Sequence, residues 1–126
     1  MARIMVLDDV LDSVVLIEKI LAKQGHEVVG FTDEEEALRY VRKHRIDLAV
    51  LDIKLGKMNG IEVLAELKRI GPAIRAVMLT GYPTVASARQ ALRLGAGEYC
   101  VKPIDKNELE DKVALVLNTL PPRCNQ

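Results

Sequence analysis

Short apolar runs alternate along this chain with longer segments in which apolar residues recur every three or four positions. Helical spacing of this kind indicates amphipathic helices, and the short continuous runs between them indicate buried strands. The predicted strands cover residues 4–7, 27–31, 48–51, 76–79 and 99–101. A helical segment follows each of them. The pattern therefore predicts an α/β fold built from five strand–helix units.

The helical segments carry the start and stop signals of globular helices. The predicted starts are near Asp12, after Thr32, near Gly60, at Pro83 and at Asp105. Asp105 and Glu108 have the spacing of a capping box, and the pair at residues 121–122, both proline, should end the last helix. The apolar positions expected to face the sheet are Val14, Ile17 and Leu21, then Ala37, Leu38 and Val41, then Ile61, Leu64 and Leu67, and finally Leu109, Val113, Val116 and Leu120.

Right-handed crossovers between parallel strands leave few possible topologies. We expect a doubly wound (βα)5 sandwich whose five-stranded parallel sheet has the order 2-1-3-4-5, as in flavodoxin-like folds. The second run lies in GHEVVGFT and is the most polar of the five, which suits an edge strand. In this order the first and third strands are neighbours. Asp9 and Asp52 should then face each other at the end of the sheet.

Polar side chains follow four of the predicted strands at the point where each strand ends. These residues are Asp8 and Asp9 after the first strand, Asp52 after the third, Thr80 after the fourth and Lys102 after the fifth. The carboxyl ends of parallel strands meet at one edge of an open α/β sheet, which is where ligands bind. Carboxylates, a hydroxyl and an ammonium group are the residue types that position a phosphoryl group. The sequence therefore predicts one pocket that holds all five.

Composition narrows the function classes. The chain has 126 residues, which suits a single domain, and its 18 basic residues balance 18 acidic ones. Charge alone would therefore not draw this domain to nucleic acid or to an anionic membrane. The two cysteines, Cys100 and Cys124, provide neither a disulfide framework nor the paired spacing of a zinc site. No apolar stretch is long enough to span a bilayer or to serve as a signal peptide, and we expect a cytoplasmic location.

The motifs LDD, LAVLD, LTG and YCVKP, in this order, resemble the receiver domain of bacterial two-component response regulators. The resemblance covers residues 1–120, and residues 121–126 are expected to be a C-terminal tail or the start of a linker. It implies that Asp52 accepts a phosphoryl group from a sensor histidine kinase or a phosphotransfer protein. It assigns Asp8 and Asp9 to the acidic pair that holds Mg²⁺ (or Mn²⁺). Lys102 and Thr80 take the places of the family's lysine and switch hydroxyl.

Physical chemistry explains why these residue types are needed together. Carboxylates about 4 Å apart repel each other by several kcal/mol per pair at an effective dielectric constant near 20, so a cation must join them. Mg²⁺ prefers oxygen ligands, and the expected ligands are Asp9, Asp52 and the backbone carbonyl of Lys54, with Asp8 acting through water. Lys102 should pair with Asp52 at rest and with a phosphoryl oxygen afterwards. Thr80 should hydrogen-bond another phosphoryl oxygen.

The resemblance further implies a switch. Thr80 would move toward the phosphoryl group, Tyr99 would turn into the space that it leaves, and the face made by the fourth helix, fifth strand and fifth helix would change. An effector domain or a second copy would read that face. The side chains of Lys54 and Tyr82 are expected to tune the phosphate lifetime. The domain would be no enzyme but would assist its own phosphotransfer and dephosphorylation, and the Lys102–Pro103 bond is at a position that is often cis in the family.

The sequence also bears on three other functions. A phosphatase of the haloacid-dehalogenase type would normally have an acid two residues after Asp52, where this chain has Lys54. A flavodoxin-like cofactor protein would need a Ser/Thr-rich phosphate loop after the first strand and more aromatic residues than this chain has. A phosphorylation-independent interaction module of the same fold stays open as the alternative, because the sequence shows that the site can form but not that a kinase uses it.

Taken one at a time, the candidate residues also fit ordinary roles. Asp8 and Asp9 would suit a helix start, Thr80 a turn and Tyr99 a core position. Their joint arrangement at successive strand ends is what favours a site. His26 and His44 lie far apart, near helix-to-strand turns, and are expected to be solvated loop residues and not ligands or bases.

Overall fold

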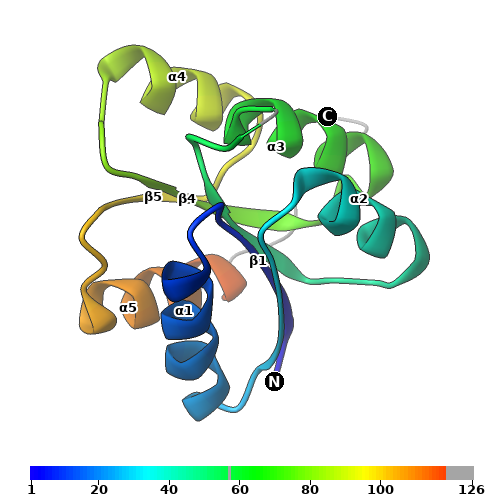
Figure 1. The fold of residues 1–126 in the computed structure, drawn as a ribbon, viewed down its shortest axis with the longest axis vertical. Coiled ribbons are helices and arrows are strands. Elements are labelled where there is room, and N and C mark those ends of the chain that lie inside the picture. Colours follow the sequence, from blue (N-terminus) through cyan, green and yellow to red (C-terminus); the bar gives the residue numbers. More distant parts are fainter. Residues whose placement is uncertain (57, 119–126) are drawn as a thin grey trace.

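The computed structural model describes residues 1–56 and 58–118, within which five strands alternate with five helices (Figure 1). The elements are β1 (Arg3–Leu7), α1 (Leu11–Lys23), β2 (Glu27–Phe31), α2 (Glu34–Lys43), β3 (Leu48–Asp52), α3 (Gly60–Ile70), β4 (Arg75–Thr80), α4 (Val85–Arg93), β5 (Glu98–Val101) and α5 (Lys106–Leu117). The predicted strand–helix order is confirmed. Among the described residues, no helix is both long and apolar enough to cross a membrane.

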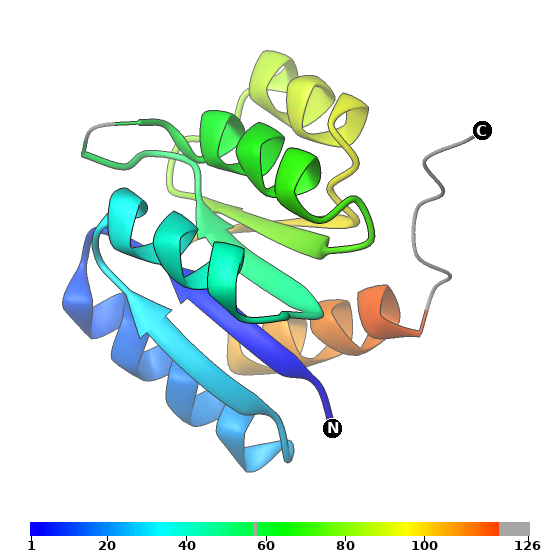
Figure 2. The same ribbon diagram turned by 90° about the vertical axis from the view of Figure 1, so that its right-hand side faces the viewer.

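The strands form one parallel sheet in the order β2-β1-β3-β4-β5, as expected from the sequence. Figure 2 shows α1 and α5 on one face of the sheet and α2, α3 and α4 on the other. The polar strand β2 lies at an edge and is only partly buried, whereas β3 is buried along its whole length. The sheet order makes β1 and β3 neighbours, which brings their carboxyl ends together.

Successive side chains of the central strands point to opposite faces and so supply two cores. Met5 and Leu7 of β1 pack with α2 and α3, whereas Ile4 and Val6 pack with α1 and α5. The predicted apolar positions of the four helices are buried as expected, from Val14 in α1 to Val116 in α5. Leu120 and the expected tail at residues 121–126 lie outside the described residues.

Helix starts differ from the sequence-based expectation in two places. The capping box expected at Asp105 and Glu108 is wrong: Asp105 accepts a hydrogen bond from the backbone of Asn107, and Glu108 instead reaches Lys112 one turn along, at 3.7 Å. Pro83 does not open α4, because the hydroxyl of Thr84 caps that helix from the following position. A capping box that was not anticipated lies at the start of α3, between Asn59 and Glu62.

The two histidines differ in their surroundings. His44 is exposed, as expected, and its ring stacks on Tyr40 with 4.1 Å between ring centroids. His26 also lies in a loop, as expected, but it is only partly exposed, and its Nδ1 accepts a hydrogen bond from the backbone N–H of Ala2 at 3.0 Å. Burial, and secondarily the positive chain terminus, lowers the pKa of His26. His26 therefore joins the residue before β1 to the turn before β2.

Candidate functional site

The sheet register brings the polar strand ends to one edge. Asp52 is the last residue of β3 and lies opposite Leu79, and Thr80 is the last residue of β4 and lies opposite Val101. The backbone N–H of Lys102 donates to the carbonyl of Thr80 at 2.7 Å. Asp8 and Asp9 directly follow β1, the other neighbour of β3. The five residues predicted from the sequence therefore lie at one edge of the sheet.

Three carboxylates gather at this edge. Asp8, Asp9 and Asp52 each offer an oxygen, and these atoms lie within 4.8 Å of one another. Asp8 is fully buried and Asp52 is 5% exposed, whereas Asp9 is exposed. One oxygen of Asp8 accepts a hydrogen bond from the backbone N–H of Val10 at 2.9 Å, which fixes the carboxylate at the start of α1.

The ammonium group of Lys102 bridges two of the three carboxylates. Its Nζ donates to Asp8 at 2.8 Å and to Asp52 at 3.3 Å. The sequence predicted the contact with Asp52 but not the shorter contact with Asp8. The Lys102–Pro103 peptide bond is cis.

The ionisation of Asp52 and Lys102 reflects both burial and the crowding of negative charge. Burial, reinforced by the charge of Asp8, raises the pKa of Asp52 to about 6, while Lys102 and the backbone N–H of Lys54 act in the opposite direction. Burial lowers the pKa of Lys102, but its hydrogen bond to Asp8 and the charges of Asp52 and Asp8 outweigh this effect, and the net pKa is raised. The raised pKa of Asp52 and the raised pKa of Lys102 both mean that the site favours an added positive charge.

The donor set fits a hard divalent cation. Mg²⁺ and Mn²⁺ take carboxylate, carbonyl and water oxygens, and the three carboxylates supply such ligands from two neighbouring strand ends. Asp9 is exposed, so its oxygens are open to solvent and to an incoming ion. The three carboxylates that the sequence assigned to a metal therefore lie together, whereas the ligand role of the Lys54 backbone carbonyl stays a prediction.

Thr80 ends β4 at the same edge of the sheet, and the exposed residues Lys54 and Tyr82 follow Asp52 and Thr80 by two positions each. Thr80 is buried, and its Oγ1 accepts a hydrogen bond from the backbone N–H of Tyr82 at 3.0 Å. The ammonium group of Lys54 lies over the ring of Tyr82, 5.0 Å from its centroid. The sequence singled out Lys54 and Tyr82 separately, but it carried no signal that they touch.

Tyr99 is half-buried between α4 and α5. Its hydroxyl lies 3.2 Å from the hydroxyl of Ser87 in α4, and its backbone carbonyl accepts from Lys112 of α5 at 2.6 Å. Ser87 also hydrogen-bonds with Thr84, the N-cap of α4. Sequence reasoning missed Ser87, because its partner lies twelve residues away on another element.

Comparison with known proteins identifies the family. Residues 4–114 match the family described as Response regulator receiver domain. The chain belongs to this family. The resemblance found in the sequence motifs is therefore confirmed. Receiver domains act as phosphorylation-activated switches in two-component signalling, and the acidic pocket of such a switch is present here.

Relatives of this receiver domain differ in length. Sporulation initiation phosphotransferase F of Bacillus subtilis (strain 168) is 32% identical over 111 residues, which cover 88% of this chain and 90% of that protein. Transcriptional regulatory protein ZraR of Escherichia coli (strain K12) is 34% identical over 107 residues, which cover 85% of this chain and 24% of that protein. The chain spans about a quarter of the length of the first curated relatives it matches.

Solved structures show the same fold for the receiver domain. A CheY-like receiver domain protein from Methanospirillum hungatei JF-1 is 30% identical, with a TM-score of 0.89 over 94% of both chains. CheY in the CheX-CheY-BeF3-Mg+2 complex from Borrelia burgdorferi is similar as well: the match has 26% identity and a TM-score of 0.88, over 94% of this chain and 90% of that chain. The predicted flavodoxin-like sheet order is confirmed.

Proposed function

We propose that Asp52 is the phosphoacceptor of this receiver domain. A carboxylate oxygen of Asp52 would attack the phosphorus of a phosphohistidine on a sensor kinase or phosphotransfer protein. The new O–P bond forms as the P–N bond breaks, and the histidine leaves with the electron pair and takes up a proton. The position of Asp52 between Asp8, Asp9 and Lys102 is the observation that carries this proposal.

The other site residues position and neutralise the transferred group. Asp9, Asp52 and the backbone carbonyl of Lys54 would hold Mg²⁺ or Mn²⁺, with Asp8 acting through water; a solved relative contains Mg²⁺. The bound ion would offset the carboxylate charges and the charge on the phosphoryl oxygens. Lys102 moves from Asp52 to a phosphoryl oxygen and keeps its bond to Asp8. The buried hydroxyl of Thr80 donates to another phosphoryl oxygen.

The same site also assists the loss of the phosphoryl group. The domain acts only on its own phosphoryl group and is not an enzyme with other substrates. Water must approach the phosphorus opposite the Asp52 oxygen, and the bond from that oxygen to phosphorus then breaks. Lys54 and Tyr82 are exposed and in contact, next to Asp52 and Thr80 in the sequence. Their paired side chains narrow this approach and set the phosphate lifetime.

The output face is made by α4, β5 and α5. When Thr80 turns toward the phosphoryl group, Tyr99 moves into the space that Thr80 leaves, and its contact with Ser87 in α4 changes. Exposed apolar side chains on this face supply contact area for an effector domain or for a second copy of the domain; they are Val85 (69% exposed), Leu92 (60%), Val101 and Leu115.

The kinase would approach from α1. Val10, Leu11, Val15 and Leu16 are exposed apolar residues at the start of this helix, next to the exposed Asp9. Such a patch beside the phosphoacceptor suits a helical partner that carries the phosphohistidine. The free, buried Cys100 fits a reducing, cytoplasmic setting, and the neutral charge balance favours no direct contact of this domain with nucleic acid or membrane.

Intact mass spectrometry tests the phosphoacceptor. Incubation with acetyl phosphate and Mg²⁺ is expected to add one phosphoryl mass, and omission of Mg²⁺ or the substitution Asp52→Asn is expected to abolish the gain. Asp111→Asn, on the exposed side of α5, is the matched control and should be phosphorylated normally. A chain that gains no mass under any of these conditions would instead be an interaction module that works without phosphorylation.

A further inference from the structure

Helix α4 is packed more weakly than the other helices. Among the described residues, Ala91 is the only one of α4 that is buried, whereas every other helix buries at least three residues. The N-terminal end of α4 is joined through the hydroxyls of Thr84 and Ser87 to Tyr99, the aromatic residue proposed to move. A helix with so little buried surface can move as a unit, and the contacts at its other end decide how it moves.

The turn after α4 is tied to the sheet. Gly95 follows the C-cap residue Leu94 and has a φ of +92°, a conformation that favours glycine. Two residues on, the backbone N–H of Gly97 donates to the carbonyl of Ala76 in β4 at 2.8 Å. The C-terminal end of α4 is therefore connected to a central part of the fold.

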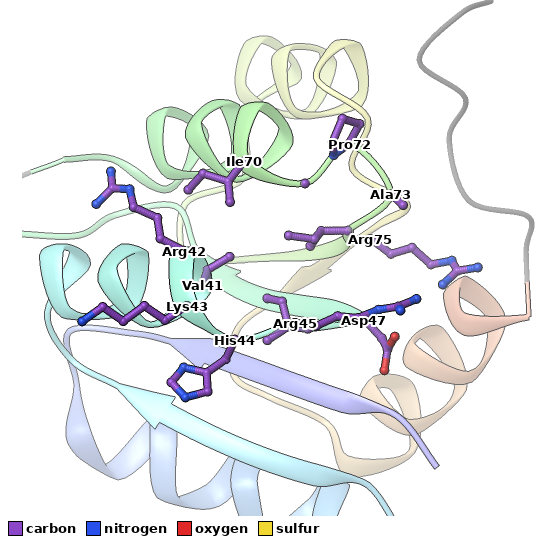
Figure 3. A pocket seen from close by; sticks show the side chains of 13 residues that line it. Val41, Arg42, Lys43, His44, Arg45, Asp47, Ile70, Pro72, Ala73 and Arg75 are labelled. Carbon is purple, nitrogen blue, oxygen red and sulfur yellow. The ribbon is translucent and has the colours of Figure 1, made fainter.

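Lys68 of the neighbouring helix α3 contacts the same turn. Its Cε and Nζ lie 3.2 and 3.5 Å from the position that a Cβ would take at Gly95. Its ammonium group donates to the carbonyl of Ile74, in the turn between α3 and β4. Residues 70–75 of that turn also line a pocket of about 500 Å³, so the turn is not packed on every side (Figure 3). Lys68 therefore joins α3, this turn and the end of α4.

The charge of Lys68 suits a position at the end of a helix. Among residues 1–56 and 58–118, no carboxylate lies within 4.0 Å of its ammonium group, and burial, followed by the charge of Arg75, lowers its pKa. Its neighbour Arg69 instead pairs with Glu66 at 3.0 Å on the surface of α3. Carbonyl groups and the negative end of the helix dipole stabilise a cation at a helix C-terminus. Lys68 has such a place beside Gly95, directly after α4.

We propose that Lys68 is a positioning residue that anchors the C-terminal end of α4, so that phosphorylation of Asp52 moves mainly the N-terminal end of this helix. The anchor stands on the contacts of Lys68, whereas the movement rests on the proposed function of Asp52. Because Tyr99 is joined to the N-terminal end of α4, its movement displaces Val85 more than Leu92. A partner would therefore detect phosphorylation at Val85, which is 69% exposed.

Amide hydrogen exchange, followed by NMR, tests the anchor in the unphosphorylated protein. Lys68→Met keeps the length of the side chain but removes its charge and its bond to Ile74. The amides of Gly95 and Ala96, which donate to carbonyls of α4 at 3.0 Å, should exchange about tenfold faster, the effect of losing one charge-assisted hydrogen bond. Lys68→Arg keeps a charged donor and should restore slow exchange. Lys19→Met, at an exposed position of α1, should match the original chain.

Exchange in the core separates anchoring from a general loss of stability. The amides of Val77 and Leu79 lie in β4 and report on unfolding of the whole domain. In Lys68→Met their exchange should rise by a smaller factor than that of Gly95 and Ala96. The anchor is overturned if exchange at the end of α4 is unchanged in Lys68→Met, or if it rises by the same factor as in β4.

Backbone chemical shifts test the movement after treatment with acetyl phosphate and Mg²⁺. In the original chain, the shift changes should be at least about twice as large at residues 84–88 as at residues 93–97, the two ends of α4. In Lys68→Met the two segments should change to a similar extent. Equal changes in the original chain, or the same ratio in Lys68→Met, would overturn the movement. Intact mass of the same samples tests Asp52 separately: a chain without added phosphoryl mass refutes the phosphoacceptor and the movement, while hydrogen exchange still decides the anchor.

Discussion

The ammonium group of Lys102 lies 2.8 Å from Asp8 and 3.3 Å from Asp52, so it is closer to the fully buried carboxylate than to the proposed phosphoacceptor. One cation therefore serves two buried anions, and the exposed Asp9 adds a third negative charge. The folded domain carries uncompensated repulsion at the place where it is to be phosphorylated. A divalent cation, or the loss of one carboxylate charge, should relieve it.

Asp52→Asn should stabilise the domain in metal-free buffer. Because burial raises the pKa of Asp52 from 3.8 to about 6, the native state binds more protons than the unfolded chain between about pH 4 and pH 6. The stability of the unmodified chain therefore falls as the pH rises through that window. Urea unfolding at pH 8 should show a gain of about 1 to 3 kcal/mol for the variant, and this gain should shrink toward pH 4. A variant less stable than the original chain at pH 8 would contradict the prediction.

The contact between Lys54 and Tyr82 should slow the loss of the phosphoryl group. Lys54→Asn and Tyr82→Ala each remove the contact and open the path of the attacking water, so each should speed hydrolysis about two- to fivefold, in line with an exposed cation–π interaction of about 0.5 to 1 kcal/mol. The decay of phosphorylated protein by intact mass measures this rate. The double variant should be no faster than the faster single variant, and Lys23→Asn, on the exposed end of α1, should have the original rate. Additive effects would mean that the two side chains act separately.

The sheet order and the strand ends could be predicted from the sequence because both depend on the local pattern of apolar and polar residues. Continuous apolar runs mark the buried strands, and the polar residue that follows each run marks its end, so Asp52 and Lys102 could be assigned to one edge without coordinates. Side-chain contacts could not be assigned in this way. Lys102 could reach either carboxylate, and only the packed structure shows that Asp8 is nearer.

The hydrogen-bond partners at helix starts could not be assigned from the sequence either, although they lie only a few residues apart. Asp105 and Glu108 have the right spacing for a capping box, but Glu108 has a competing cation in Lys112, which the spacing does not reveal. The contact of Ser87 with Tyr99 joins α4 to β5 and has no sequence signature at all. Local rules therefore gave the elements and the strand-end chemistry, and long-range packing decided the partners.

Ser87→Ala should shift the switch toward its phosphorylated arrangement. The hydroxyl contact of Ser87 with Tyr99 holds the aromatic ring to α4 in the present arrangement, and one such hydrogen bond contributes about 1 kcal/mol. Phosphorylation by acetyl phosphate should therefore be about fivefold faster in the variant. Tyr99→Phe removes the same bond from the other side, and the double variant should match either single variant. Gln90→Ala, exposed on α4, is the control. An unchanged rate in both single variants would show that the bond is not coupled to the switch.

Gly60→Ala should displace Asp52, because Gly60 lies directly against the backbone of that residue. A Cβ at Gly60 would collide with the backbone carbonyl of Asp52, because the start of α3 packs directly on the end of β3 and the N–H of Gly60 donates to the carbonyl of Ile53 at 2.6 Å. Relief of the collision must move Asp52 or lift α3, at a cost of about 1 to 3 kcal/mol in the free energy of unfolding. Phosphorylation should also slow, since Asp52 leaves its place beside Lys102. Gly56→Ala is the matched control: among the described residues its Cβ would meet only Glu34, at 3.8 Å, and both stability and phosphorylation should be retained. Equal stability of the two variants would mean that α3 can shift without disturbing the phosphoacceptor.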